Sequence, residues 1–365
     1  MVTQEIVCVV GARPNFMKMA PILEALRPNP QIQPFLVHTG QHYDEAMSRI
    51  FFDELGLPEP DHNLEIGSES HGRQTGQIMS AFDELLEGRG TRAVIVVGDV
   101  NSTMACGLVA VKRGIPLAHV EAGLRSGDRT MPEEINRLVT DAVSDLLFAT
   151  SMDAVTNLAA EGIPGSRVRL VGNPMIDTLR RNEPAARGKR TWERFGFLER
   201  GYALVTVHRP SNVDNPNTLR AIIRALDELS GRIPVLFPAH PRTLERIRQD
   251  DIKPGAGLAL TQPLGYLDFL SLMTAARFVL TDSGGVQEET TALGVPCLTL
   301  RESTERPVTV SEGTNRILGA DPAAIVSAAE SLLNGGPPNP RFPALWDGHA
   351  GQRIAAEIGR FLGCP

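Results

Sequence analysis

The sequence has no apolar run that approaches the roughly 20 residues a membrane-spanning helix needs. Its first residues, MVTQEIVCVVGARP, lack the charged start, long apolar centre and small-residue cleavage site of a signal peptide. The four cysteines stand far apart and form no CxxC pair: Cys8, Cys106, Cys297 and Cys364. These absences argue against membrane insertion, export and a disulfide or metal framework, and they favour reduced thiols in a cytoplasmic protein.

A basic excess is also missing from this chain of 365 residues. It carries 36 lysines and arginines against 43 aspartates and glutamates, which gives a formal net charge of −7. A general nucleic-acid binder would show the opposite balance, so we expect no nucleic-acid partner. A local basic pocket for a phosphorylated ligand remains compatible with this charge. The length fits two domains.

The sequence is rich in short apolar runs that alternate with amphipathic segments. Most of the runs are nearly continuous, which is typical of parallel strands buried on both faces. We expect strands at 6–11, 34–39, 93–98, 117–121, 146–150, 167–172, 203–208, 235–240, 258–262, 278–281 and 297–301. Helical patterns lie between them, at 75–87, 102–113, 133–143, 218–230 and 286–293 among others. This alternation predicts a doubly wound α/β fold.

The alternation occurs twice, and a polar stretch at 182–200 that offers no strand separates the two copies. We therefore expect two Rossmann-like domains that face each other across a cleft, 1–172 and 173–350, with the hinge near 173–178. The tail at 351–365 has apolar residues at helical spacing, which predicts a closing helix on the first domain. Ligands of open α/β sheets bind beyond the carboxyl ends of the strands, so functional side chains should directly follow strands.

The segment GARPNFMK at 11–18 follows the first expected strand. Pro14 is well placed to begin a helix, whose N-terminus offers unpaired N–H groups and a partial positive charge. Arg13 and Lys18 add two cations, which favours an anion site. An ordinary strand-to-helix turn with two solvated cations accounts for the same residues.

Acidic residues follow the next strands of the first half. Asp99 comes directly after the strand at 93–98, where an aspartate also serves as a helix cap. Glu121 ends the strand at 117–121, and Glu133 and Glu134 fall in the first turn of the following helix, where the helix dipole favours ionised carboxylates. Because the three acidic positions converge on one edge of one sheet, we interpret Asp99, Glu121 and Glu133 as functional.

The second half supplies the complementary charge. His208 and Arg209 follow its first expected strand, and His240 follows its second. The segment TDSGGVQEE then places Ser283, Gly284 and Gly285 between a strand and a helix, where free backbone N–H groups form a nest that holds a diphosphate. Glu289, one turn further on, is suited to accept hydrogen bonds from a ribose.

Carboxylates repel a diphosphate, so the two halves should bind different parts of one ligand. A nucleotide sugar fits this arrangement, with the nucleotide in the second domain and the sugar against the acids of the first.

Eight segments together carry a resemblance to a known family: GARPNFMKMAP, TGQHYD, VVGDVNST, HVEAGLRSGDRTMPEEINR, VGNPMID, VTVHRPSN, TDSGGVQEE and RESTERP. In order and spacing, from residue 6 to about residue 320, they closely resemble the non-hydrolysing UDP-N-acetylglucosamine 2-epimerases. The resemblance implies a fold like that of B-type glycosyltransferases. It also implies the interconversion of UDP-GlcNAc and UDP-ManNAc by a homodimer that uses no metal or nicotinamide.

Carried over by position, the resemblance implies catalytic roles for Asp99, Glu121, Glu133 and His208. It implies UDP contacts for a second set: Arg13, Lys18, Ser283, Gly284, Gly285 and Glu289. The chain departs from better-known members by reading GARPNFMK for GTRPEAIK and HRPSN for HRREN. Asp44 and the Pro210–Ser211 pair fall where some members bind a second substrate molecule as an activator.

Inversion at C2 would proceed by elimination of UDP to 2-acetamidoglucal and re-addition after protonation from the other face, which needs an acid and a base. The sequence does not decide which carboxylate plays which part. Three alternatives remain: a hydrolysing epimerase, a glycosyltransferase with the same fold, and a non-catalytic nucleotide-sugar sensor.

Overall fold

The computed structural model describes residues 3–40, 59–335 and 341–364, and it consists of two compact units. Unit 1 comprises Met1–Arg180 and Ala344–Pro365, and unit 2 comprises Arg181–Pro343. The chain passes from one unit to the other inside helix α7 (Pro174–Lys189). The expected hinge at 173–178 therefore falls largely in the first turns of a helix.

The polar stretch at 182–200 is helical over much of its length, since it contains the end of α7 and the short helix α8 (Thr191–Arg194). Pro184 lies inside α7, where it costs one backbone hydrogen bond but keeps a helical φ. Glu183 and Arg187 form an ion pair at helical i,i+4 spacing, 2.9 Å apart, which supports the helix on the solvent side.

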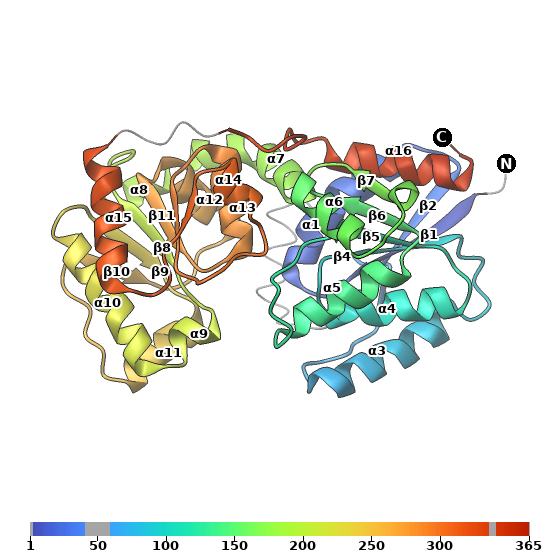
Figure 1. The fold of residues 1–365 in the computed structure, drawn as a ribbon, viewed down its shortest axis with the longest axis horizontal. Coiled ribbons are helices and arrows are strands. Elements are labelled where there is room, and N and C mark those ends of the chain that lie inside the picture. The colour runs from blue at the N-terminus through green and yellow to red at the C-terminus, as the bar shows by residue number, and fades with distance from the viewer. Residues whose placement is uncertain (1–2, 41–58, 336–340, 365) are drawn as a thin grey trace. The chain divides into compact units, whose positions relative to one another are not determined.

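Unit 1 is built on a seven-stranded parallel sheet in the order β3-β2-β1-β4-β5-β6-β7, and all of these strands except β3 are labelled in Figure 1. The strands are β1 (Gln4–Val10), β2 (Ile32–His38), β3 (His62–Asn63), β4 (Ala93–Val97), β5 (Leu117–Ala122), β6 (Leu146–Ala149) and β7 (Val168–Leu170). Strand order reverses between β1 and β4, which is the switch point where doubly wound sheets bind ligands.

The helices of unit 1, apart from the C-terminal one, connect successive parallel strands. They are α1 (Arg13–Leu26), α3 (His71–Leu86), α4 (Asn101–Lys112), α5 (Pro132–Val143), α6 (Met152–Ala160), the 3₁₀ turn η1 (Gly165–Arg167) and the C-terminal α16 (Ala350–Leu362). All of them except α16 lie in the connections between successive strands, so the unit is doubly wound.

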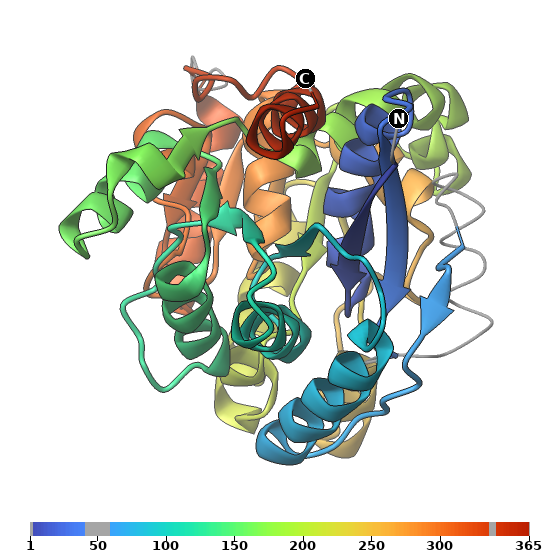
Figure 2. The same cartoon turned by 90° about the vertical axis from the view of Figure 1, so that its right-hand side faces the viewer.

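Helix α16 packs against α1 although the two lie at opposite ends of the sequence, and Figure 2 shows the dark red helix beside the dark blue one. Gly351 makes this contact close: a Cβ there would lie 2.6 Å from the carbonyl oxygen of Pro21. The carboxylate of Asp177 in α7 accepts the N–H groups of Ala350 and Gly351 and so caps α16.

Unit 2 repeats the design with a six-stranded parallel sheet in the order β10-β9-β8-β11-β12-β13. Its strands are β8 (Ala203–Thr206), β9 (Val235–Pro238), β10 (Leu258–Thr261), β11 (Phe278–Thr281), β12 (Cys297–Thr299) and β13 (Asn315–Ile317). Its further helices are α9 (Pro210–Val213), α10 (Pro216–Ser230), α11 (Pro241–Gln249), α12 (Tyr266–Ala275), α13 (Gly284–Leu293), α14 (Val308–Ser311) and α15 (Pro322–Asn334).

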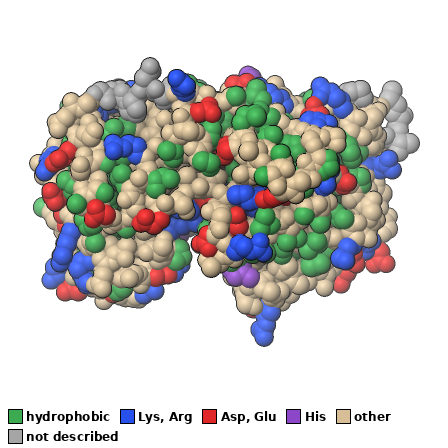
Figure 3. All heavy atoms as spheres, in the orientation of Figure 1, with side chains coloured by type: hydrophobic (Ala, Val, Ile, Leu, Met, Phe, Trp, Pro, Cys, Tyr) green, Lys and Arg blue, Asp and Glu red, His purple; other side chains and the backbone are tan. Residues whose placement is uncertain are grey.

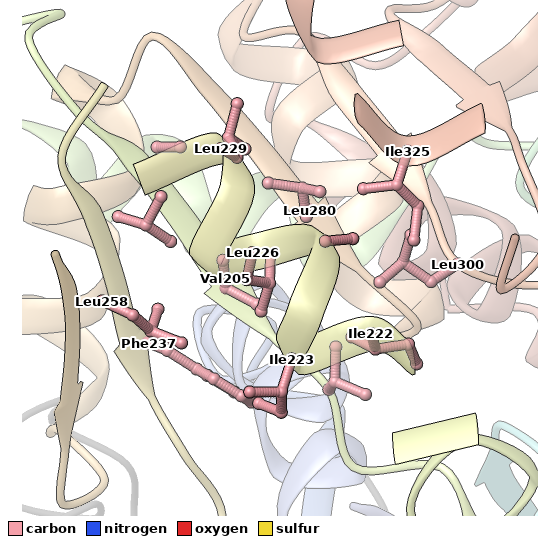
Figure 4. Close-up of a cluster of buried hydrophobic side chains, with 14 of the residues drawn as sticks. Val205, Ile222, Ile223, Leu226, Leu229, Phe237, Leu258, Leu280, Leu300 and Ile325 are labelled. Carbon is pink, nitrogen blue, oxygen red and sulfur yellow. The ribbon is translucent and has the colours of Figure 1, made fainter. Parts of the chain in front are cut away.

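The core of unit 2 forms where α10 covers one face of the sheet. Figure 4 shows Leu226 of α10 beside Val205 of β8, and Ile223 near Phe237 of β9. All four side chains are buried, and each contributes roughly 1.5–3 kcal/mol relative to an exposed position. The rigid sheet beneath fixes where the loops after its strands begin.

The predicted fold class is confirmed: both units are parallel α/β sheets with alternating helices. All eleven expected strands occur, most of them one or two residues shorter at an end. Strands β3 and β13 were not predicted. They have two and three residues and lie at sheet edges, so their apolar runs are too short to be recognised as strands in the sequence.

None of the helices in the described ranges is long and apolar enough to span a bilayer. On the face drawn in Figure 3, acidic and basic side chains are interspersed, in keeping with the modest net charge of −7.

We predict that Gly351→Ala destabilises unit 1, by about 1–3 kcal/mol, because the added methyl group meets the backbone of α1. Urea unfolding followed by the fluorescence of Trp346, in a Trp192→Phe background, reports on unit 1 alone, since the chain has two tryptophans. Gly76→Ala is the control: Gly76 is an exposed glycine of α3 with open space around it, so we expect stabilisation of about 0.5–1 kcal/mol. Equal effects of the two changes would contradict the close approach.

Candidate active site

The candidate residues of unit 1 lie at the carboxyl edge of the sheet, where β1, β4 and β5 end. The side-chain oxygen of Asn15 accepts the N–H groups of Gly11 and Ala12, and its amide donates to the carbonyl of Val97 at 3.0 Å. One buried amide thereby joins the loop after β1 to the end of β4. The two strand ends on either side of the switch point are fixed to each other.

Glu121 lies in this edge with a strained backbone. Its φ is +72°, in the left-handed region that non-glycine residues rarely adopt, and the pairing of β5 with β6 shifts register at this point. The side chain is buried and forms an ion pair with Lys18 of α1. A backbone strained to place a buried carboxylate is a mark of a functional position.

The predicted Glu121 is therefore brought together with Lys18, which the resemblance assigned to UDP. Gly98 makes room for the Asn15 amide and the Glu121 carboxylate, since a Cβ there would lie 2.9 Å from the amide nitrogen and 3.4 Å from a carboxylate oxygen. Arg13 is the first residue of α1, and its side chain lies outside the described part of the structure.

Asp99 also belongs to this edge, but it is not a helix cap. Val100 is the N-cap of α4, and no side chain caps it. The Asp99 carboxylate instead pairs with Arg137 of α5 at 2.5 Å, and its backbone carbonyl accepts from the Asn136 amide at 2.8 Å. Helix α5 thus holds the loop that carries Asp99.

Glu133 and Glu134 are neighbours with different surroundings. Glu134 is buried, accepts the N–H groups of Ser126 and Gly127 at 2.9 and 3.0 Å, and pairs with Arg137. Burial alone would raise the pKa of Glu134, but these donors outweigh it and the pKa is lowered. Glu133 is half-buried and has no hydrogen bond or ion pair within the described ranges.

A buried His119–Asp141 pair lies behind these loops and was not predicted as part of the site. The two ring nitrogens of His119 meet the Asp141 carboxylate at 2.6 Å and the carbonyl of Gly98 at 2.8 Å. The second Asp141 oxygen accepts the N–H of Gly123 at 3.0 Å and an Arg125 guanidinium at 2.7 Å. This one pair fixes the turn before Asp99 and the turn after Glu121.

In unit 2 the loop after β8 is arranged around Asp282, which directly follows β11 and is fully buried. Its carboxylate accepts the backbone N–H groups of His208 and Arg209 and the side-chain amide of Asn212, at 2.9–3.2 Å. One of its oxygens also lies 3.3 Å from Nδ1 of His208, whose side chain is 42% exposed.

The two predicted histidines come together. The rings of His208 and His240 lie 6.3 Å apart between centroids, and Nδ1 of His240 accepts the N–H of Arg242 at the start of α11. Burial lowers the pKa of His240, and the nearby His208 and Arg242 lower it further, so His240 is neutral at pH 7.

Cations gather around one buried acid in unit 2. Glu305 pairs with Arg301 at 2.8 Å and lies 3.7 Å from Arg209 and 3.5 Å from Arg306. Burial alone would raise the pKa of Glu305, but the arginines outweigh it and hold the pKa far below its ordinary value. Three guanidinium groups share this carboxylate, which favours anion binding beside Arg209.

The glycine nest begins α13 as expected: Ser283 is its N-cap, and Gly284 and Gly285 are its first residues. The N–H of Ser283 donates to the hydroxyl of Thr281 at 3.0 Å. A Cβ at Gly284 would lie 2.5 Å from the guanidinium of Arg306, which pairs with Glu288. Gly284 therefore lets a cation reach the start of this helix, a contact that the sequence did not reveal.

Glu289 lies one turn further along α13 and is buried. The hydroxyl of Tyr266 donates to it at 2.9 Å. Burial raises the pKa of Glu289 to about 7, and the neighbouring Glu288 adds to the shift while Tyr266 opposes it. Its proton is therefore exchangeable near neutral pH.

Several residues of the site were missed by sequence reasoning, and they share one property. Each acts by holding a predicted residue or its loop: Arg137, Asp141, Asp282, Glu305, Arg306 and Tyr266. Asp282 had a signal, because it stands at a strand end beside the glycines. Among the described residues, no group of three or more His, Cys, Asp or Glu side chains is arranged to hold a metal ion.

Comparison with known proteins gives a consistent result. A family model described as UDP-N-acetylglucosamine 2-epimerase matches residues 24–359. The UDP-N-acetylglucosamine 2-epimerase of Methanocaldococcus jannaschii is 42% identical over 335 residues, covering 89% of this chain and 91% of the relative. A crystal structure of the M. jannaschii enzyme in complex with UDP-GlcNAc and UDP matches with a TM-score of 0.89 and 40% identity, covering 98% and 100% of the two chains.

A second kind of relative acts on a different sugar. The UDP-2,3-diacetamido-2,3-dideoxy-D-glucuronate 2-epimerase of Pseudomonas aeruginosa is 38% identical over 331 residues, covering 90% of this chain and 92% of the relative.

The raised pKa of Glu289 predicts a pH-dependent stability of unit 2. The unfolded chain loses this proton near pH 4.5 and the folded chain near pH 7, so the free energy of unfolding should fall by about 3 kcal/mol between these values and then level off. In Glu289→Gln this component should be absent, because glutamine accepts the Tyr266 bond without titrating. Urea unfolding at pH 5, 6, 7 and 8, followed by Trp192 in a Trp346→Phe background, measures the difference. Parallel curves for the two proteins would contradict the shift.

Proposed function

Because the chain belongs to the UDP-N-acetylglucosamine 2-epimerase family, we propose that it interconverts UDP-GlcNAc and UDP-ManNAc without releasing free sugar. The observation that carries the proposal is the set of three carboxylates, Asp99, Glu121 and Glu133, at the ligand-binding edge of unit 1. We infer a cytoplasmic homodimer that needs neither metal nor nicotinamide.

The chemistry explains why several carboxylates are needed. The C2 proton of an N-acetylhexosamine is not next to a carbonyl, so it becomes acidic only as the C1–oxygen bond breaks. Loss of this proton and of UDP gives 2-acetamidoglucal. Protonation of C2 from the opposite face and return of UDP to C1 give the epimer. An acid and a base on opposite sides of C2 carry the two proton transfers.

The surroundings of the three carboxylates differ in a way that suits these roles. Protonation of Asp99 would break one of the two ion pairs of Arg137, and protonation of Glu121 would leave the buried Lys18 beside a neutral partner, which is costly. Glu133 has no cationic partner among the described residues, so it gains and loses a proton without breaking an ion pair. We assign one transfer to Glu133, and leave the other to Asp99 or Glu121.

Unit 2 supplies the groups for the departing UDP. The N–H groups of Gly284 and Gly285 at the start of α13, together with the adjacent Ser283 side chain, suit a diphosphate. Arg209 and His208 add positive charge where negative charge develops on the leaving oxygen. Glu289 is placed to bind the ribose.

A specific relative suggests a second sugar. The Pseudomonas aeruginosa relative acts on a 2,3-diacetamido glucuronate, a sugar with the same C2 acetamido group. Since the reaction at C1 and C2 is the same for both sugars, the carboxylates serve either substrate. The choice between them depends on contacts to C3 and C6.

The test is incubation of the purified protein in D₂O with each UDP sugar, followed by NMR. We expect the C2-epimer with deuterium at C2 and none at C4, because a proton held on a carboxylate exchanges with solvent. Activity should persist after treatment with EDTA and without added nicotinamide.

Each other outcome has its own meaning. Free deuterated ManNAc with no UDP-ManNAc would indicate a hydrolysing epimerase. Unchanged, undeuterated substrate would indicate a sensor or a glycosyltransferase. Epimer without deuterium at C2 would exclude exchange through these acids.

The adjacent glutamates of α5 give a matched pair of variants. Glu133→Gln should lower kcat on the order of 10²- to 10⁴-fold with unchanged UDP affinity and thermal stability. Glu134→Gln should lower the melting temperature, because Glu134 holds two backbone N–H groups and Arg137. Calorimetry with UDP, thermal unfolding and initial rates separate the two effects. Full turnover in Glu133→Gln would remove this residue from the acid–base set.

A further inference from the structure

We propose that Asp282 is a positioning residue that holds the His208 ring with its Nδ1–H toward the protein, so that Nε2–H is directed outward to the departing diphosphate. The inference deepens the proposed function and rests on it. The pairing itself is a property of unit 2 and is tested separately.

The first argument is the geometry of the pair. Asp282 is fully buried, whereas the His208 side chain is 42% exposed, so the ring reaches from a buried carboxylate toward solvent. An oxygen of Asp282 lies 3.3 Å from Nδ1. A carboxylate there accepts only from a protonated Nδ1, which leaves Nε2 as the nitrogen that can meet a ligand.

The second argument is that Asp282 fixes the backbone as well as the ring. It accepts the N–H groups of His208 and Arg209 at 2.9–3.2 Å and the Asn212 amide at 3.0 Å, and that amide also donates to the carbonyl of Leu300. The loop after β8 is therefore attached to the end of β11. With the His208 backbone N–H and its Nδ1 both held by the same carboxylate, the ring has little freedom to turn.

The third argument concerns charge. Among the described residues, the charged and titratable groups that contact or adjoin His208 are Asp282, His240 at 6.3 Å between ring centroids and the adjacent Arg209. The pKa of His240 is lowered by burial first and then by His208 and Arg242, so its neutral ring does not oppose a charge on His208. A carboxylate at Nδ1 stabilises the imidazolium form, which keeps a proton on Nε2.

In the reaction, the C1–oxygen bond breaks with its electron pair going to the diphosphate oxygen, and the Nε2–H of His208 donates a hydrogen bond to that oxygen. The return of UDP to C1 reverses this step. Without Asp282 the ring would turn freely, so a hydrogen bond needed in the transition state would be lost.

The direct measurement is ¹⁵N–¹H NMR of the histidine side chains in the wild-type protein with UDP bound, with the His208 signals identified by their absence in His208→Gln. We expect Nδ1 of His208 to be protonated. In Asp282→Asn we expect a different distribution of the proton between Nδ1 and Nε2, because the amide no longer requires a donor at Nδ1. The wild-type spectrum decides the tautomer even if the buried variant fails to fold.

Kinetics test whether Asp282 acts through His208. Asp282→Asn should lower kcat on the order of 10²- to 10⁴-fold with little change in KM or UDP affinity. In a His208→Gln background the same substitution should lower kcat by less than about threefold, because the histidine that Asp282 positions is already absent. Asn212→Ala is the control: it removes another ligand of Asp282, so it should lower thermal stability and leave the His208 tautomer unchanged.

Several results would overturn the inference: an unprotonated Nδ1 in the wild type, an unchanged tautomer in Asp282→Asn, or an equal loss of kcat in both backgrounds. A protein that turns over neither UDP sugar would defeat the proposed function. The spectra would then still decide the His208–Asp282 pairing.

Discussion

Buried carboxylates that accept several hydrogen bonds at once hold the loops on which the rest of the site depends. Asp282 in unit 2 collects two backbone N–H groups and an amide, and Asp141 in unit 1 collects a histidine, a backbone N–H and an arginine. An ionised carboxylate in a protein interior is costly unless its oxygens are saturated, so each one imposes a definite loop conformation on its donors. The strain at Glu121 persists because the surrounding turns are fixed in this way.

This arrangement separates the groups that react from the groups that hold them. Glu133 and Glu134 are adjacent in sequence. The carboxylate of Glu134 accepts two N–H groups and pairs with an arginine, whereas Glu133 has no partner among the described residues. His208 and Asp282 divide in the same way, one exposed and one buried. A group that must change protonation or meet a ligand keeps hydrogen-bonding capacity unused, and its neighbour supplies the rigidity.

Sequence reasoning located the strand ends because a buried parallel strand is a continuous apolar run, and the topology then brings its last residue to the ligand-binding edge. This is why Glu121 and His208 were predicted as site positions. The sequence could not predict which side chains pair with each other. Lys18 was expected at UDP and lies against Glu121, and Arg137 pairs with Asp99, 38 positions away in the sequence. Such pairs depend on which rotamers the packed loops allow. The continuation of α7 past Pro184 was missed for a similar reason, because tertiary packing overrides a single unfavourable residue.

The packing of α16 on α1 has a consequence for how the chain is made. Unit 1 is interrupted by the whole of unit 2, since its sequence resumes only at Ala344. On the ribosome, residues 181–343 emerge complete before the helix that covers α1 has been synthesised. Unit 2 is therefore free to fold as a continuous segment, while the apolar surface of α1 around Pro21 stays uncovered until α16 has been synthesised. Synthesis of unit 1 begins before that of unit 2 and ends after it. During translation, the uncovered surface of unit 1 is therefore the part that most needs protection from aggregation.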